Sequence, residues 1–208
     1  MTAPPRPAPG RRTRAPAGGA QRQARLPSVG VVVATRDRPH LLRRAIDGVL
    51  AQDYPGPVRL VVVYDGSPPD YLLAQTGERA VLVLVNWHAP GLAGARNTGI
   101  LALDSDLVAF CDDDDVWAPT KLSRQVAALT ARPGAEFATC AIEVEYEGRV
   151  NRRLAGTDVV ALPDLVRSRM AMLHASGFLV ARRCLLDADE GVGLVAEDAP
   201  GRDRKSVV

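Results

Sequence analysis

The sequence has few cysteines, no long hydrophobic run and no acidic residue near its amino terminus. Cys111, Cys140 and Cys184 are odd in number and widely spaced, which argues against both a disulfide framework and a zinc site. No stretch reaches the ~18 apolar residues of a membrane span, and the first residues lack the roughly seven apolar residues of a signal peptide. We therefore expect a soluble, cytoplasmic protein with reduced cysteines.

The stretch without acids, residues 1–27, also lacks apolar periodicity. It carries six arginines among proline, alanine, glycine and glutamine, a composition typical of a disordered basic arm. Removing these six charges from the formal net charge of +2 leaves −4 for the remainder. This balance argues against specific nucleic-acid binding. The arm is either a solvated tail or a segment that contacts an anionic partner, namely lipid at the inner face of a membrane or nucleic acid without sequence specificity.

Four continuous apolar runs are rich in β-branched residues, which is typical of strands covered on both faces of a parallel sheet. They are residues 29–34, 58–64, 80–85 and 107–111. The segments between and after them predict helices, either from apolar residues at three-to-four spacing or from a glycine-rich opening. These helices cover residues 39–50, 91–103 and 121–132, with a short one at 71–75. This alternation predicts a doubly wound α/β sheet flanked by helices.

The later part of the chain predicts smaller elements. Alternating residues 137–146 and the stretch 150–154 predict an antiparallel hairpin, because a Glu-Gly turn separates them. A helix is expected over residues 162–170 and a short strand over 177–181. We expect one domain over residues 28–190, followed by residues 191–208 as an incomplete segment or a disordered tail.

Four consecutive aspartates, Asp112–Asp115, directly follow the last apolar run. Neighbouring carboxylates about 4 Å apart repel by roughly 4 kcal/mol at an effective dielectric of about 20, so a cation is expected beside them. An all-oxygen donor set suits Mg²⁺ or Mn²⁺. The alternative is that the acids cap the following helix, a role open to Asp115 in either case.

Two other polar clusters also fall where predicted strands end, at residues 35–37 and 65–67. Ligands of open α/β sheets bind beyond the carboxyl ends of the strands, so three clusters at one edge indicate a binding site. Any one of them alone is explained by the polarity of turns. Arg96, in the glycine-rich stretch 91–99, suits either a phosphate or a salt bridge to a nearby aspartate.

Five motifs in order resemble the signature of family 2 glycosyltransferases with the GT-A fold, over about residues 28–190. They are VVVATRDRP at 31–39, LAQDYP at 50–55, VVYDGS at 62–67, GLAGARNTG at 91–99 and FCDDDDVWAPTKL at 110–122. The resemblance implies a GT-A (Rossmann-like) fold and transfer of a sugar from a nucleotide diphosphate sugar to a hydroxyl acceptor. It further implies a single displacement with inversion.

The resemblance also implies roles for residues. Thr35 and Asp65 would hold the nucleotide, with Arg36 in the same pocket, and Asp113 would lie near the ribose. The metal, Mg²⁺ or Mn²⁺, maps to Asp114 with Asp112, and Arg96 maps to substrate binding. Tyr64 stands where the family usually has an acid before Asp65.

The carboxyl-terminal part departs from the family pattern. The family's general base is an acid in a pair that a helix follows, whereas here Glu197-Asp198 precede a basic stretch and Asp203 is the nearest positional candidate. In the family, the segment that corresponds to His174 lies close to the donor sugar and the acceptor, which implies a substrate-binding role for His174. The family continues with helices on the acceptor side, so the chain looks truncated.

Three functions are therefore weighed. The first is a metal-dependent glycosyltransferase acting on a glycan, a lipid carrier or a secondary metabolite. The second is a catalytically incomplete domain that binds nucleotide sugars. A nucleotidyltransferase is disfavoured, because no glycine- and lysine-bearing phosphate loop follows the first strand.

Overall fold

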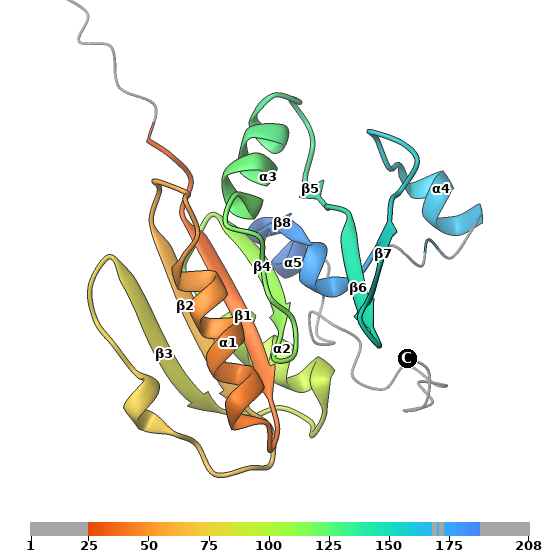
Figure 1. Cartoon of the computed structure of the whole chain (residues 1–208). Coiled ribbons are helices and arrows are strands. Elements are labelled where there is room, and N and C mark those ends of the chain that lie inside the picture. Colours follow the sequence, from red (N-terminus) through yellow and green to blue (C-terminus); the bar gives the residue numbers. More distant parts are fainter. Residues whose placement is uncertain (1–24, 168–169, 171–172, 188–208) are drawn as a thin grey trace, which may run out of the picture.

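The central layer is a sheet of six strands (Figure 1). These strands are β1 (Val29–Thr35), β2 (Val58–Tyr64), β3 (Arg79–Val85), β4 (Leu107–Asp112), β5 (Phe137–Ala138) and β8 (Leu179–Ala181). Their order is β3-β2-β1-β4-β8-β5, in which β1 to β4 are parallel and β8 is antiparallel to both of its neighbours. The computed structural model describes residues 25–167, 170 and 173–187.

Helices pack on both faces of this sheet, and a separate hairpin lies beside it (Figure 1). The helices are α1 (Pro39–Leu50), α2 (Leu92–Leu101), α3 (Lys121–Thr130), α4 (Leu162–Arg167) and α5 (Arg182–Asp187), with 3₁₀ turns η1 (Tyr71–Leu73) and η2 (Ala175–Gly177). The hairpin consists of β6 (Ile142–Tyr146) and β7 (Arg149–Arg153). The expected α/β sheet with a small antiparallel hairpin is confirmed.

The core has two parts because side chains of a strand alternate between the faces of the sheet. Val31 and Val33 of β1 pack with residues of α1 and α3, whereas Val32 between them packs on the side of α2. A Cβ on Gly99 of α2 would lie 2.4 Å from a methyl of Val32. Glycine at this position therefore lets α2 approach β1 closely, which fixes the height of Arg96 above the sheet.

The prediction of one strand over residues 137–146 is wrong. Phe137 and Ala138 pair with β8 in the main sheet, whereas Ile142–Tyr146 pair only with β7. The end of β5 is also bonded to α3, because the Gln125 side chain donates a hydrogen bond to the Ala138 carbonyl at 3.4 Å. Alternation of side chains cannot distinguish one strand from two that join different sheets, because both keep the period of two.

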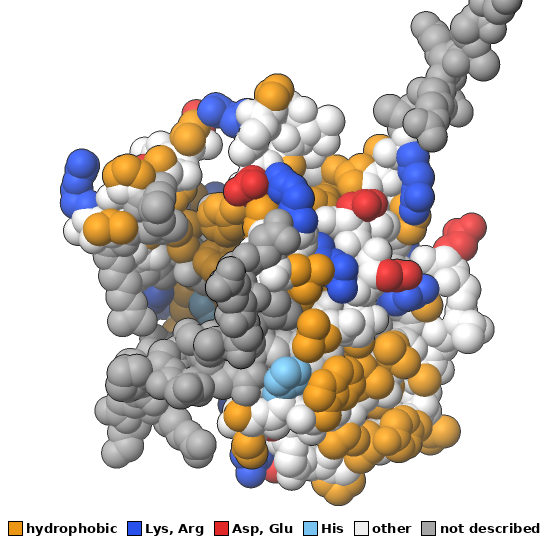
Figure 2. All heavy atoms as spheres, turned by 180° about the vertical axis from the view of Figure 1, so that it is seen from behind, with side chains coloured by type: hydrophobic (Ala, Val, Ile, Leu, Met, Phe, Trp, Pro, Cys, Tyr) orange, Lys and Arg blue, Asp and Glu red, His pale blue; other side chains and the backbone are white. Residues whose placement is uncertain are grey.

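The β2–β3 connection contains only η1, and α2 packs on β1 and β2, which leaves Leu82 and Val85 of the edge strand β3 exposed. Figure 2, seen from behind, shows hydrophobic side chains gathered over this side of the molecule. Among the residues that the structure describes, no helix is both long and apolar enough to cross a bilayer. The three cysteines are free thiols, and Cys111 is buried.

Asp106 links the amino end of β4 to the start of β1. Its carboxylate accepts hydrogen bonds of 2.7 Å from both the backbone N–H and the hydroxyl of Ser28. These bonds lower the pKa of Asp106 below its ordinary value, and the bond from the Ser28 backbone has the larger effect. The stabilisation is therefore present above about pH 4 and is lost as the pH falls through the lowered pKa.

We expect Asp106→Asn to lower the free energy of unfolding by about 1 kcal/mol at pH 7, a value limited by solvent screening. The difference from the unsubstituted chain should be smaller in urea titrations at about pH 2.5. Asp104→Asn is the control, because Asp104 forms only an exposed ion pair with Arg59. An equal loss at both pH values would contradict the role given to the carboxylate.

Candidate active site

The carboxyl ends of β1, β2 and β4 meet at one edge of the sheet. Thr35 pairs with Tyr64 of β2, and Ala34 pairs with Asp112 of β4. Because β1 lies between β2 and β4, the chain winds away from β1 in both directions, and such a reversal is where open α/β sheets bind ligands. The three polar clusters expected at this edge are therefore adjacent in space.

Asp65 follows β2 and holds the loop between β3 and α2. Its side chain is buried, and its two carboxylate oxygens accept hydrogen bonds of 2.9 Å from the Asn86 side chain and from the Gly91 backbone. Asn86 in turn accepts a hydrogen bond from the Thr98 hydroxyl of α2 at 2.8 Å. Asp65 thus fixes the opening of α2 relative to the end of β2.

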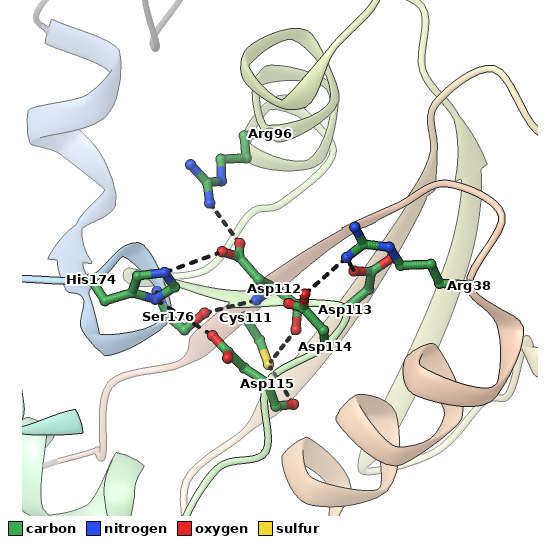
Figure 3. Close-up of polar contacts among 9 residues, drawn as sticks. All are labelled: Arg38, Arg96, Cys111, Asp112, Asp113, Asp114, Asp115, His174 and Ser176. Carbon is green, nitrogen blue, oxygen red and sulfur yellow. Dashed lines mark hydrogen bonds and ion pairs between the residues drawn. The ribbon is translucent and has the colours of Figure 1, made fainter. Parts of the chain in front are cut away.

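Asp113 and Asp114 are paired with groups from the β1–α1 segment (Figure 3). The Thr35 hydroxyl donates to buried Asp113 at 2.7 Å, and Arg38 contacts Asp113 at 3.2 Å and Asp114 at 2.9 Å. Arg38 therefore supplies one of the positive charges that four consecutive carboxylates require. Arg36, two residues earlier, is exposed and lies beside Gly66 in the turn after Asp65.

Asp112, the last residue of β4, forms the least exposed ion pair of the site. The guanidinium of Arg96, in α2, donates a hydrogen bond of 2.6 Å to one Asp112 carboxylate oxygen, and the Arg96 side chain is only 12% exposed. Arg96 also lies over the ring of Phe110, 5.6 Å from its centroid. The salt-bridge interpretation of Arg96 therefore holds in this structure, and its guanidinium lies at the edge where the polar clusters meet.

Asp115 lies opposite His174, which precedes the η2 turn (Figure 3). The His174 Nδ1 atom is 3.5 Å from Asp115, and its Nε2 atom is 3.8 Å from Asp112. Burial raises the pKa of Asp115, while a hydrogen bond from Ser176 and the nearby His174 oppose that rise. The raised pKa thus reflects mainly the removal of this carboxylate from water, with the nearby Asp112 and Asp114 adding to the effect.

The donor set of this group fits a divalent ion. Asp112, Asp115 and His174 offer one ligand atom each, and these atoms lie within 4.8 Å of one another. Carboxylate oxygens suit Mg²⁺ and Mn²⁺, and an imidazole nitrogen favours Mn²⁺ of the two. The cap interpretation fails, because α3 begins at Lys121 with Thr120 as its N-cap and has no acid in its first turn.

The structure brings together most of the residues predicted from the sequence. Those at the common edge are Thr35, Asp65, Arg96, Asp112, Asp113, Asp114 and His174. The Asp114 side chain pairs with Arg38 instead of joining Asp112, Asp115 and His174. Asp203 lies outside the described residues, as do the segments 1–24 and 191–208. Sequence reasoning missed Arg38 and Ser176 and did not assign Asp115 to the metal. Of these residues, only Arg38 could have been found from the sequence, because it is a cation in the polar cluster that follows the first strand.

Comparisons with known proteins agree with this geometry. Residues 30–179 match the family described as Glycosyl transferase family 2. The succinoglycan biosynthesis protein ExoW of Rhizobium meliloti is 31% identical over 175 residues, which cover 74% of this chain and 54% of that protein. The Escherichia coli protein WfgD, named as a UDP-Glc:alpha-D-GlcNAc-diphosphoundecaprenol beta-1,3-glucosyltransferase, is 29% identical over 49% of this chain and 40% of its own length.

Solved structures show the same fold. TarS of S. aureus in complex with UDP superposes with a TM-score of 0.60 at 19% identity, over 80% of this chain and 50% of that one. A mannosyltransferase of Pyrobaculum calidifontis in complex with GDP-Man and Mn²⁺ gives a TM-score of 0.56 at 20% identity, over 82% of this chain and 49% of that one. The chain thus spans about half the length of these proteins. The expected GT-A fold is confirmed, and the chain belongs to glycosyl transferase family 2.

Proposed function

We propose that this chain is the donor-binding part of an inverting glycosyltransferase. It would move a sugar from a nucleotide diphosphate sugar to an acceptor hydroxyl with the help of a divalent ion. The observation that carries the proposal is that Asp65, Asp113 and the group of Asp112, Asp115 and His174 meet at one edge of the sheet. Membership of the family supports it, as do the similar solved structures in complex with UDP, UDP-GlcNAc or GDP-Man and Mn²⁺.

In this proposal, different residues of the chain contact different parts of the donor. We assign the nucleoside to Thr35, Arg36 and Asp65, and the ribose to Asp113, because these side chains surround the ends of β1 and β2. Arg96 adds positive charge beside Asp112, where the diphosphate would come close to the ion. A planar guanidinium suits a phosphate in charge and shape.

We assign the ion to Asp112, Asp115 and His174. When bound, a divalent ion neutralises the diphosphate leaving group as the anomeric C–O bond breaks. The sequence assigns Asp114 to the ion as well, and that role requires the 2.9 Å ion pair between Asp114 and Arg38 to break. The chain therefore carries an internal cation that competes for one predicted ligand.

Inversion needs a general base that takes the proton of the acceptor hydroxyl. Asp203 is the proposed base, and it lies outside the described residues. The relative WfgD is named for a diphosphoundecaprenol-linked acceptor, which supports a lipid-linked glycan as the acceptor class. We propose that, in acting on such an acceptor, the chain contacts the cytoplasmic face of a membrane peripherally.

A catalytically incomplete domain that binds nucleotide sugars is the second candidate. It is favoured by the sequence after Glu197-Asp198, whose basic residues do not resemble the helix that follows the family's acidic pair. In that case the donor edge described above would bind nucleotide and metal without transfer. The two candidates share the donor site and differ only on the acceptor side.

The test is calorimetric titration of UDP, GDP and TDP with and without Mn²⁺, followed by hydrolysis of the matching sugar donor. Metal-dependent binding of one nucleotide with slow release of its sugar is the result expected of a transferase. Binding without release favours the incomplete domain. If none of the three nucleotides binds in the presence of Mn²⁺, both candidates fail.

A further inference from the structure

The η2 turn is attached to the end of β4 and to α3, although it is distant from both in sequence. Its residue Ser176 is only 6% exposed, and its neighbour Gly177 accepts a hydrogen bond of 2.6 Å from the Gln125 side chain of α3. Gln125 is itself oriented by Lys121, whose ammonium group donates to its Oε1 atom at 2.8 Å. These contacts fix the position of the turn that carries His174.

The Ser176 hydroxyl holds the backbone of the acidic loop (Figure 3). Its oxygen accepts the backbone N–H of Asp112 at 2.9 Å, and hydrogen bonding by Ser176 also lowers the pKa of Asp115 against the effect of burial. A hydroxyl has one donor and spare acceptor capacity, so one side chain serves both aspartates. The backbone N–H of Ser176 also lies 3.4 Å from the Nδ1 atom of His174.

Ser176 therefore touches all three members of the group assigned to the ion. Without its hydroxyl, the backbone N–H of Asp112 would lose its acceptor and Asp115 would lose a donor, in a partly buried place where unmade hydrogen bonds are costly. The two like-charged aspartates would then be free to move apart. Separation of the ligands matters, because a metal site depends on groups that hold its ligands in position.

We propose that Ser176 is a positioning residue that sets the spacing of Asp112, Asp115 and His174, and thereby the affinity of this site for Mn²⁺. The inference rests on the proposed function, since it takes this group as the ion site. It adds that Ser176 acts on the ion through its ligands rather than by direct contact, with its hydroxyl on the two aspartates and its backbone N–H on His174. It also makes the η2 turn, rather than the acidic loop alone, a determinant of metal binding.

The test measures binding of Mn²⁺ by the chain in the presence of saturating UDP, through loss of the electron paramagnetic resonance signal of free Mn²⁺. Ser176→Ala removes the hydroxyl, and Ser176→Cys keeps nearly its size while offering only a weak donor. Both should weaken Mn²⁺ binding by about 10–100-fold, the range known for groups that orient metal ligands. UDP affinity measured without metal should stay unchanged, which a general loss of structure would not allow.

Ser123→Ala is the matched control, because Ser123 bonds only the Thr120 carbonyl at the exposed start of α3. Thermal unfolding identifies variants that fold, and Ser176→Cys replaces Ser176→Ala if the latter does not. A folded Ser176 variant that binds Mn²⁺ as tightly as the unsubstituted chain overturns the inference and leaves the proposed function standing. Failure of the unsubstituted chain itself to bind Mn²⁺ with UDP would instead overturn the proposed function.

Discussion

Replacement of Asp112 by Asn is expected to weaken the Mn²⁺-dependent part of nucleotide binding by about 100-fold or more. The reason is that Asp112 belongs both to the ligands predicted from the sequence and to the group that the structure brings together. Loss of groups that merely orient metal ligands already costs about 10–100-fold in affinity, and loss of a ligand's charge should cost more. Calorimetry of UDP binding with and without Mn²⁺ gives the effect directly.

Two controls make this result specific. Asp104→Asn changes an exposed aspartate before β4 that pairs only with Arg59, so its binding should match that of the unsubstituted chain. Arg96 is largely buried against Asp112, and its charge would lose a partner in Asp112→Asn. Thermal unfolding must therefore show that the variant is folded. If Mn²⁺ enhanced UDP binding equally in the folded variant and the unsubstituted chain, Asp112 would be excluded as a ligand.

Asp65→Asn should weaken nucleotide binding by about 10–100-fold whether or not metal is present. The buried carboxylate accepts from Asn86 and from the Gly91 backbone, so an amide in its place must turn one donor toward another donor. A hydrogen bond to a charged group is worth about 1.5–3 kcal/mol, which is about one to two decades in affinity. UDP titrations at zero and saturating Mn²⁺ measure the two values.

The matched control for Asp65 is Asp70→Asn in the same connection. Asp70 also follows β2, but it pairs with exposed Arg43 and accepts the Leu72 N–H of η1 rather than bonding Asn86 or Gly91. Its effect on UDP binding should lie within a factor of about two, as for ordinary surface substitutions. A loss for Asp65→Asn that appears only with Mn²⁺ would contradict its assignment to the nucleoside.

The parts of the fold that repeat locally were predictable. Residues 39–50 carry apolar residues at helical spacing and residues 58–64 form a β-branched run, and both elements appear at these bounds. The short strand expected over residues 177–181 appears as β8, but its antiparallel pairing and the division of residues 137–146 between two sheets were not predictable, because pairing partners depend on distant segments. The periodicity of a segment does not determine which other strand it pairs with in the sheet.

The candidate site divides in the same way. Asp65 and Asp112 were predictable because each directly follows an apolar strand, and parallel strands end at one edge. Ser176 was not, because it approaches Asp112 only through the docking of η2, 64 positions further along the chain. Arg38 was visible as a polar neighbour of Thr35, but its choice of Asp113 and Asp114 depends on how two loops meet.

The most direct test of the central claim, that this edge binds nucleotide and metal together, is a reciprocal titration on the unsubstituted chain. The affinity of UDP is measured at zero and saturating Mn²⁺, and the affinity of Mn²⁺ at zero and saturating UDP. Because coupling between two ligands is reciprocal, both ratios should be equal and well above one. Equal affinities with and without the other ligand would show that the two do not share a site, which contradicts the account.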